Sequence, residues 1–482
     1  EGRITTEERA LVTGRRPTVT ASDRRKLARD LIAGADHLGS AFAALRSPEL
    51  RRENGATYTP NAIGRTMVEW ALRQKVVPAR IVDAGAGSGR YAISAALAFP
   101  KARVIAIEKD PLAALVLRAN VALAKLSDRV SVRVEGNHDT ALETIDGSTL
   151  YIGNPPYIRH HDIAPEWKAW YSKLSAKHGV KASQLAGLHL HFFLKTLDLA
   201  KAGDIGCFIT AAEWLDVNYG EALRKLLVGP LGIRSLDVID PKVPVFDDAM
   251  TSAVITAFEI GAHRESVPVR LIKTARSLST AALGTGPRVK TSRLVDAPKW
   301  GPVIRGCDEG PTGGRLVGDL FRVRRRQVTG NNSVWVVDPD TADLPEAVLR
   351  RAVTRARELF ESNGVLRDDE ELKAVVDLPM DLDELSAEDR RAVRAFLERA
   401  QRAGADQSYI ARHRNPWFAV KLHEPAPILC TYMARRAPAF VINNCRARHI
   451  NIAHGLYPKV EMDTATLTAI VAQLNSSVGV QS

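Results

Sequence analysis

Residues 80–89 are Arg80-Ile81-Val82-Asp83-Ala84-Gly85-Ala86-Gly87-Ser88-Gly89. The apolar residues at the start predict a short buried strand, and the glycines that follow predict a tight turn into a helix. Glycine has no Cβ, so the backbone of this turn can approach a ligand closely, and a helix N-terminus favours a polar or anionic group. The spacing is not G-x-G-x-x-G and no phosphate-binding lysine follows, which argues against a dinucleotide or a nucleoside triphosphate.

The same alternation of short apolar runs and helical segments continues along the chain. Strands are predicted at 103–108, 130–134, 148–152, 204–210, 235–239 and 252–259, and helices at 91–99, 111–126, 185–200 and 220–227. Alternation of this kind is typical of a parallel sheet covered by helices on both faces. The predicted fold is therefore α/β, and the α/β region ends near Gly261.

The chain divides into four predicted parts. Residues 1–50 predict a helical lead-in, 51–262 the α/β domain, 263–300 a linker and 301–482 a second domain. The linker is predicted from its polar composition and its glycines and prolines. The second domain is predicted to be α+β, with short strands around 316–323, 333–337 and 439–442 and charged helices around 343–361 and 386–403.

Composition excludes several classes of protein. The chain has 482 residues, of which 45% are hydrophobic and 25% charged, so it is not broadly disordered. No apolar run approaches the roughly 20 residues that span a bilayer, and no signal-peptide pattern is present, so we expect a cytoplasmic protein without membrane contact. The net charge of +12 weakly suggests a polyanionic partner.

Cysteine and histidine positions give no sign of a metal site. The four cysteines are far apart and form no C-x-x-C pair, which fits a reducing cytoplasm and argues against a disulfide framework or a zinc cluster. His160, His161, His189 and His191 lack a third ligand at a diagnostic spacing. We therefore expect no metal, and we interpret these histidines as loop and helix-surface residues.

Two carboxylates flank the glycine turn in the predicted sheet. Glu108 ends the second strand, where it can accept hydrogen bonds from both hydroxyls of a ribose, and Asp83 can meet a ligand's ammonium group from the end of the first strand. The alternative for Glu108 alone is a solvated charge at a strand end. An acid for an amine, an acid for a diol and the turn at Gly85 and Gly87 suit S-adenosylmethionine better than a dinucleotide.

The stretch after the strand at 148–152 is Gly153-Asn154-Pro155-Pro156-Tyr157. Pro155 and Pro156 fix their φ angles and remove two donors, which makes a stiff turn. The Asn154 amide oxygen and the Pro155 carbonyl are two acceptors suited to an exocyclic NH2 group, and Tyr157 can stack on the ring that carries it. The alternative is a rigid structural loop. Open α/β sheets bind ligands at the carboxyl ends of their strands, which favours a functional turn here.

Together these motifs resemble the gamma-class adenine-N6 DNA methyltransferases of restriction–modification systems. That family has a cofactor-contacting Thr-Pro turn, a glycine loop, the Asn-Pro-Pro-Tyr turn and a C-terminal target-recognition domain, in the order found here from Tyr58-Thr59-Pro60 onward. The resemblance covers residues 45–260 well and the C-terminal part loosely. It implies a Rossmann-like S-adenosylmethionine methyltransferase domain followed by an α+β target-recognition domain.

The resemblance also assigns roles to single residues. It implies that Tyr58 and Thr59 contact the cofactor, and that Phe246 is a second aromatic beside Tyr157 against a flipped base. Where the family usually has an acid that holds the cofactor adenine, this chain has Asn137, followed by Asp139. Either of these two residues could make that contact.

A run of arginines opens the predicted recognition domain. Its members are Arg322, Arg324, Arg325 and Arg326. Such a run is often a solvated face, but beside Gln327 and residues 329–332 it could provide phosphate contacts and base-edge readers. The expected partner is therefore double-stranded DNA. No P-D…(D/E)-x-K nuclease signature precedes the methyltransferase part, so we expect any restriction endonuclease to be a separate protein.

The predicted reaction is methyl transfer from S-adenosylmethionine to adenine N6 of a base flipped out of duplex DNA. Two alternatives stay open. An RNA or protein-glutamine methyltransferase could carry the same turn, and a DNA-binding subunit could have lost catalysis. The intact residues 154–157 argue against the second alternative, and the large C-terminal part with its clusters of arginines argues against a glutamine substrate.

Overall fold

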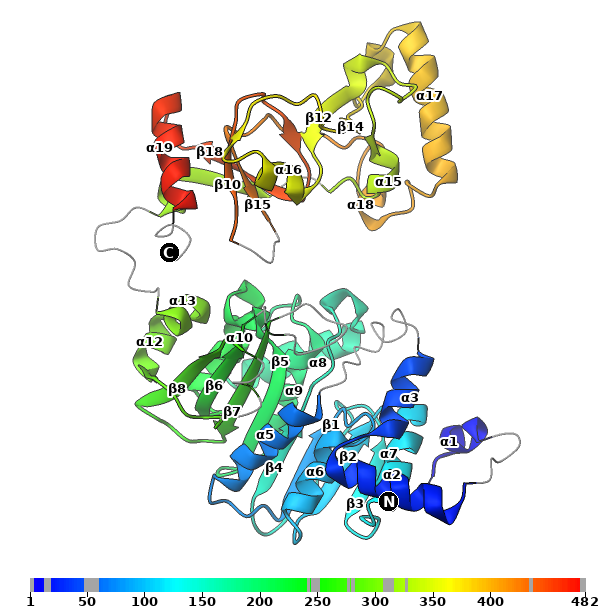
Figure 1. The fold of residues 1–482 in the computed structure, drawn as a ribbon, viewed down its shortest axis with the longest axis vertical. Coiled ribbons are helices and arrows are strands. Elements are labelled where there is room, and N and C mark those ends of the chain that lie inside the picture. The colour runs from blue at the N-terminus through cyan, green and yellow to red at the C-terminus, as the bar shows by residue number, and fades with distance from the viewer. Residues whose placement is uncertain are drawn as a thin grey trace. The chain divides into compact units, whose positions relative to one another are not determined.

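The computed structural model describes residues 4–12, 19–46, 60–240, 243, 252–274, 278, 282–306, 316–325, 328–432 and 437–476. The chain forms two compact units, Glu1–Asp308 and Glu309–Ser482, which are drawn in Figure 1. Within the described residues, no helix is both long enough and apolar enough to cross a membrane.

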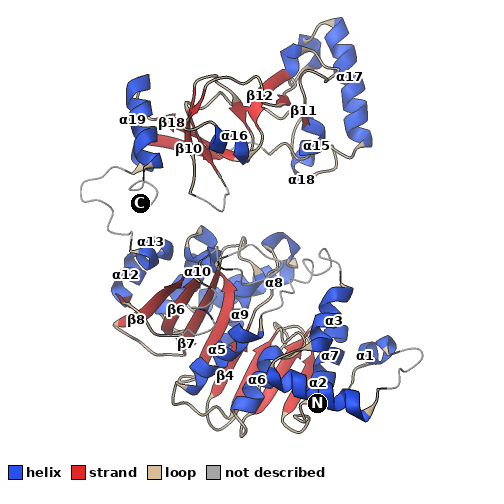
Figure 2. Ribbon diagram, viewed as in Figure 1, coloured by secondary structure: helices blue, strands red, loops and turns tan. Residues whose placement is uncertain are grey.

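A nine-stranded sheet forms the centre of the first unit, in the order β3-β2-β1-β4-β5-β7-β6-β8-β9 (Figure 2). The strands are β1 (Arg80–Ala84), β2 (Arg103–Glu108), β3 (Val130–Val134), β4 (Thr149–Gly153), β5 (Ile205–Ala211), β6 (Ile233–Ile239), β7 (Ala253–Glu259), β8 (Ser266–Ile272) and β9 (Arg288–Lys290). Strands β1 to β5 are parallel, but β7 runs antiparallel to both β5 and β6. The sheet is thus mixed and not parallel throughout, because β6 and β7 are sequential strands that pair directly.

Helices cover both faces of this sheet, as expected for an α/β domain. The helices are α5 (Asn61–Leu72), α6 (Arg90–Ala98), α7 (Pro111–Leu123), α8 (Pro165–Lys177), α9 (Leu188–Leu199), α10 (Glu221–Val228), α12 (Thr291–Asp296) and α13 (Trp300–Arg305). One apolar core includes side chains of α5, α6 and α7, and a second includes side chains of α8, α9 and α10. Strands β1, β4 and β5 are buried at every residue, which explains their nearly continuous apolar sequences.

Short helices in the first 46 residues pack against α7 (Figure 1). They are α1 (Thr6–Leu11), α2 (Ala21–Ala33) and α3 (His37–Leu45). The Arg118 Nε donates to Glu8 Oε1 at 2.7 Å, and both side chains are buried. Helix α2 starts at its N-cap Thr20 and ends at Gly34, whose φ of 103° is left-handed. The lead-in region therefore contains helices, as the sequence predicts.

The segment 263–300, predicted as a linker, instead extends the sheet. Strand β8 pairs in parallel with β6, and β9 pairs with β8. The buried Asp237 of β6 accepts hydrogen bonds from Arg270 Nε at 2.9 Å and from the Gly284 amide at 3.0 Å. Gly284, Gly286 and Pro287, which suggest a linker, therefore lie between the paired strands β8 and β9, and the first compact unit continues well past residue 262.

The second unit contains two small sheets, in the orders β10-β18-β15-β16-β13 and β11-β14-β12-β17. Their strands are β10 (Phe321–Arg325), β11 (Val336–Val337), β12 (Leu349–Val353), β13 (Val365–Leu366), β14 (Ala374–Val376), β15 (Ile428–Thr431), β16 (Phe440–Asn443), β17 (Arg448–His449) and β18 (Ala453–Pro458). The helices are α14 (Val317–Leu320), α15 (Asn332–Trp335), α16 (Ala356–Glu361), α17 (Ala387–Arg402), α18 (Tyr409–Arg412) and α19 (Thr464–Asn475). This is the α+β composition that the sequence predicts.

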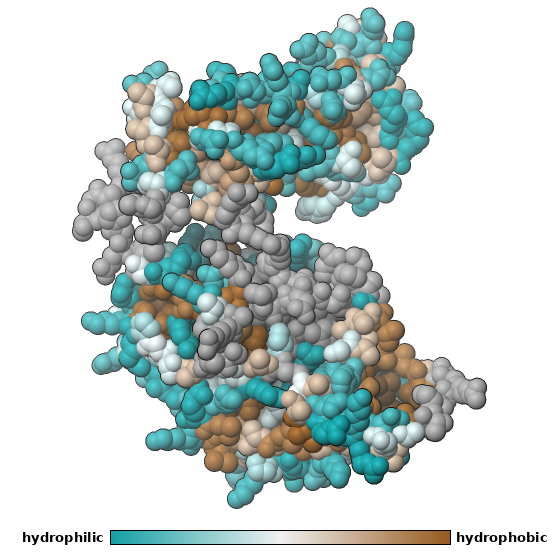
Figure 3. Space-filling view, viewed as in Figure 1, coloured by the Kyte–Doolittle hydropathy of each residue, from teal (hydrophilic) through white to brown (hydrophobic). Residues whose placement is uncertain are grey.

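The prediction of a helix at 343–361 is wrong for the first half of that range. Residues 349–353 form β12, which pairs with β14 and β17. Ala352 and Val353 are completely buried there, so pairing within the sheet overrides the local helical pattern. The helix predicted at 386–403 is present as α17, whose outward side is hydrophilic in Figure 3.

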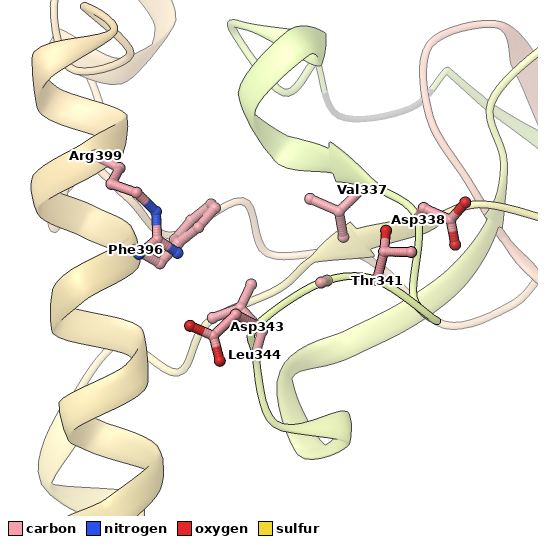
Figure 4. Close-up of a pocket in the computed structure, with 8 residues that line it drawn as sticks. Val337, Asp338, Thr341, Asp343, Leu344, Phe396 and Arg399 are labelled. Carbon is pink, nitrogen blue, oxygen red and sulfur yellow. The ribbon is translucent and has the colours of Figure 1, made fainter.

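A cleft of about 310 Å³ lies between α17 and the segment after β11 (Figure 4). Phe396 and Arg399 of α17 form one wall, and the facing segment contributes Asp338 and Asp343. Two carboxylates in the lining would repel a phosphate group, so this cleft does not suit the DNA backbone.

Candidate active site

The glycine loop, residues 85–89, lies beside the turn formed by residues 154–157, which we call the NPPY turn. Strands β1 and β4 are parallel neighbours, with Val82 level with Tyr151, so both loops leave the sheet at its carboxyl edge. A Cβ built on Gly85 would lie 3.5 Å from Pro156 Cδ and 4.0 Å from the Asn154 carbonyl oxygen. Two motifs that are distant in sequence therefore form one site.

The glycine loop needs its glycines for two different reasons. Gly85, Gly87 and Gly89 all have left-handed φ angles, of 76°, 56° and 94°. A Cβ on Gly89 would lie only 2.3 Å from Leu117 Cδ1 of α7, so this glycine permits close packing. A Cβ on Gly87 would meet no described atom within 4 Å. The backbone at Gly87 therefore faces open space that a ligand can enter.

Glu108 is bound to the same loop. Its Oε2 accepts a hydrogen bond from the Gly87 amide at 2.8 Å, and its Oε1 accepts one from the Asp110 amide at 2.9 Å. Burial raises the pKa of Glu108, while these two backbone donors oppose that shift. A carboxylate has about four acceptor positions, so Glu108 can hold the loop and still accept from two ligand hydroxyls.

Asp83 lies beneath the glycine loop. Its carboxyl group is completely buried, and Oδ2 accepts a hydrogen bond from the Ala92 amide of α6 at 2.9 Å. A Cβ built on Gly153 would lie 3.0 Å from the other oxygen. Burial raises the pKa of Asp83 to about 8. Asp83 thus links β1 to α6, while its Oδ1 has no hydrogen-bond partner among the described residues, so its predicted contact with a ligand's ammonium group stays a prediction.

The NPPY turn continues directly from β4. Pro155 is buried, and Asn154, Pro156 and Tyr157 are half-buried. The centroids of the Tyr157 and His189 rings are 6.0 Å apart, and the planes of the two rings are tilted by 32°. Burial raises the pKa of the Tyr157 hydroxyl well above its ordinary value, and the nearby Tyr91 and Glu213 add to this effect. A neutral ring at this edge suits stacking on a base.

Asn137 and Asp139 follow β3 at the same edge of the sheet. The Asn137 side-chain nitrogen is buried and makes no hydrogen bond with any residue that the structure describes. A buried amide donor normally has an acceptor, so Asn137 suits an acceptor atom on a ligand. The Asp139 carboxylate turns back toward Gly136. Its Oδ2 would lie 2.8 Å from a Cβ built on Gly136. Of these two alternatives for the cofactor adenine, the geometry favours Asn137.

A cluster of rings that sequence reasoning missed holds the loop with Asn137. The His138 ring stacks on Trp167 of α8 at 4.2 Å, and its Nε2 lies 3.1 Å from His191 Nδ1 on α9. The His191 ring stacks on Tyr171 at 4.3 Å. Burial lowers the pKa of His138 to about 4 and that of His191 to about 3, so both rings are neutral at pH 7.

The prediction that His189 and His191 are surface residues is therefore wrong. Both are buried, with exposed fractions of 3% and 1%, because α9 is buried from His189 to Leu197 and also contacts α8 and α10. Contacts between residues as far apart as 138 and 191 leave no local sequence signal. Among the described residues, no three histidine, cysteine, aspartate or glutamate side chains are grouped so that they could hold a metal ion.

Some predicted site residues lie outside the described residues. These are Tyr58, Thr59, Phe246 and Arg326.

The remaining arginines of the predicted DNA-binding run lie on β10, an edge strand. Arg322, Arg324 and Arg325 are exposed. Because side chains alternate along a strand, the first two share one face of the sheet and Arg325 lies on the other. The guanidinium of Arg324 lies 5.6 Å from the Tyr457 ring, and that of Arg325 lies 5.1 Å from the Tyr432 ring. The run is therefore split between two faces, and aromatic rings support both sides.

Comparisons with known proteins agree with this arrangement. Residues 139–243 match the Eco57I restriction-modification methylase family, and residues 313–479 match the C-terminal domain of Type II methyltransferase M.Eco57I. Type II methyltransferase M.XamI of Xanthomonas campestris pv. amaranthicola is 48% identical over 424 residues, which are 88% of this chain and 80% of that protein. Type II methyltransferase M.AccI of Acinetobacter calcoaceticus is 22% identical over 316 residues, 63% of this chain and 58% of that protein.

Among solved structures, a complex of DrdV with DNA aligns with 93% of this chain and 52% of that chain, at a TM-score of 0.53 and 13% identity. At that identity the likeness concerns the fold alone. The fold and these matches define a Rossmann-like methyltransferase of restriction–modification systems. The chain belongs to the Type II DNA methyltransferase family that includes the Eco57I methylase.

Proposed function

We propose that this DNA methyltransferase transfers a methyl group from S-adenosylmethionine to N6 of an adenine that is flipped out of duplex DNA. The observation that carries the proposal is the closeness of Gly85 to the NPPY turn, which lies 3.5 Å from a Cβ built on Gly85. It brings a loop suited to a nucleoside cofactor next to two fixed acceptors suited to an exocyclic amino group. The sequence resemblance to the gamma-class enzymes supports this proposal, because it concerns the same two motifs in the same order.

The cofactor half of the site would use the glycine loop and the ends of β2 and β3. Gly85 and Gly87 allow close approach of the ligand, Glu108 would accept from the ribose hydroxyls, and Asn137 would bind the adenine ring. Tyr58 and Thr59 remain proposed cofactor contacts from the resemblance alone. When bound, the cofactor supplies an electrophilic methyl group on a sulfonium centre.

The acceptor half would use the NPPY turn. Adenine N6 is a weak nucleophile because its lone pair is delocalised into the ring. Hydrogen bonds from N6 to the Asn154 side-chain oxygen and the Pro155 carbonyl would favour a more tetrahedral nitrogen and aim its lone pair at the methyl group. Orientation and fixed dipoles then supply most of the rate enhancement, without a covalent intermediate.

The free-energy cost of base flipping would be offset partly by stacking of the flipped base on aromatic side chains. Extruding a base costs a few kcal/mol, and stacking on aromatic side chains returns about 1–3 kcal/mol per base. Tyr157 is the stacking partner on the NPPY turn, and Phe246 is the second one that the resemblance implies. We propose that the C-terminal unit recognises the target sequence, and that any restriction endonuclease is a separate protein.

The Asn154→Ala variant tests this proposal. Loss of one acceptor at the reacting nitrogen should reduce methyl transfer to duplex DNA by about a hundredfold or more. Binding of S-adenosylmethionine, measured by calorimetry, should change little because Asn154 belongs to the acceptor half of the site. Substantial residual methyl transfer by Asn154→Ala would contradict the proposal. Methylation of RNA or of protein glutamine in place of duplex DNA would favour the alternative substrates.

A further inference from the structure

Asp36, the N-cap residue of α3, is bound to the cofactor loop of the first unit. Its carboxylate is buried, with 4% of the residue exposed. The Oδ2 atom accepts hydrogen bonds from Ser88 Oγ at 2.5 Å and from Arg90 Nε at 3.2 Å. The Oδ1 atom accepts from the Gly39 amide at 2.8 Å and from Asn120 Nδ2 at 2.9 Å. Four donors therefore use all the acceptor positions of one carboxylate.

Ser88 stands between Gly87 and Gly89, in the middle of the glycine loop. It is 3% exposed, and its carbonyl oxygen accepts a second bond from Asn120 Nδ2 at 3.0 Å. Both the side chain and the backbone of Ser88 are thus held by residues outside the loop. Gly87, the residue before Ser88, faces the open space described above.

The sequence of α3 allows this close approach. A Cβ on Gly39 would lie 2.1 Å from Asp36 Oδ2 and 2.6 Å from Ser88 Oγ. Any larger residue at position 39 would separate α3 from the loop. The buried pair of Glu8 and Arg118 holds α1 against α7 at a different point.

We infer that Asp36 is a positioning residue for the cofactor loop, and that α3, which Asp36 caps, is therefore part of the cofactor site. This inference rests on the proposed use of S-adenosylmethionine. Hydrogen bonds to a charged acceptor are roughly twice as strong as those between neutral groups. Asp36 holds Ser88 in its binding conformation before the ligand arrives, so less ordering is needed on binding.

Cofactor binding to the loop has a thermodynamic consequence for α3. If the state of the loop and that of α3 are coupled, the coupling acts in both directions. A ligand that binds the loop must then stabilise α3, which is joined to the loop through Asp36 and Ser88. Amide hydrogen exchange over residues 37–45 measures this stabilisation directly.

The test compares Ser88→Ala, Asp36→Asn and the control Thr20→Ala in the full chain. Thr20 caps α2 as Asp36 caps α3, since its Oγ1 accepts from the Asp23 amide at 3.1 Å, but Thr20 is exposed and does not touch the loop. Ser88→Ala leaves the bond from the Gly39 amide to Asp36 in place. It therefore remains informative if Asp36→Asn fails to fold.

We expect Ser88→Ala and Asp36→Asn to weaken S-adenosylmethionine binding by about tenfold, with kcat at saturating cofactor nearly unchanged. Thr20→Ala should bind like the wild type. The cofactor should slow amide exchange over residues 37–45 in the wild type and in Thr20→Ala, but much less in Ser88→Ala. Wild-type affinity and wild-type exchange protection in Ser88→Ala would overturn this inference and leave the proposed function intact. A wild-type chain that binds no S-adenosylmethionine would overturn both.

Discussion

Gly87 donates a backbone hydrogen bond to Glu108 at 2.8 Å, and on its other side it faces open space. The hydrogen bond fixes the loop to the end of β2. The open space makes Gly87 sensitive to any added side chain, because a methyl group there would project into the volume that we assign to the cofactor.

The Gly87→Ala variant should therefore lose cofactor binding. Alanine in a left-handed conformation costs about 1–2 kcal/mol of stability, and the methyl group would additionally occupy ligand space. Gly203→Ala is the matched control. Gly203 also has a left-handed φ, of 85°, and no neighbour within 4 Å of a built Cβ, but it precedes β5 at the opposite edge of the sheet. Calorimetry should show normal affinity for S-adenosylmethionine only in the control, and equal affinities would contradict the assignment.

Asp83 makes the stability of the first unit depend on pH. Its pKa is raised from 3.8 to about 8 by burial, so the folded chain holds a proton that the unfolded chain has released. The contribution of Asp83 to the free energy of unfolding is then fully present below about pH 4. It is lost as pH rises toward 8, by about 1.4 kcal/mol per pH unit for one proton. Asp83→Asn should flatten this slope between pH 5 and 8 in chemical denaturation. An unchanged slope would mean that Asp83 is ionised in the folded chain.

The arginines of β10 should contribute to DNA affinity without sequence preference. Arg322 and Arg324 share one face of the edge strand, so replacing both with glutamine should remove two phosphate contacts. The slope of log affinity against log salt concentration should fall by about 2. Arg391→Gln with Arg394→Gln is a control with the same loss of charge, on the exposed side of α17. Equal slopes for both double variants would show that only net charge matters.

Much of the sheet can be predicted from sequence because its central strands are buried on both faces. The central strand β1 is buried at every residue, as its apolar sequence predicts, and β2 and β3 beside it also have the predicted bounds, 103–108 and 130–134. Strand β8 is different, because Ser266, Pro268 and Arg270 alternate with buried residues and resemble a polar linker. Its place in the sheet depends on pairing with β6, which no local pattern specifies.

The candidate site shows the same limit. The order of the glycine loop, Glu108 and the NPPY turn along the chain indicates a site at the carboxyl edge of the sheet, and the structure brings these segments together. The bond between Asp36 and Ser88 cannot be predicted from sequence, because it depends on how α3 packs against α7.

The central claim is that the NPPY turn presents adenine N6 to the methyl group of S-adenosylmethionine. The most direct measurement is mass spectrometry of nucleosides from duplex DNA incubated with the full chain and isotopically labelled cofactor. We predict labelled N6-methyladenine with the wild type, and at least about a hundredfold less with Asn154→Ala under conditions where that variant still binds the cofactor. Label in methylcytosine, or equal labelling of adenine by both chains, would contradict the account.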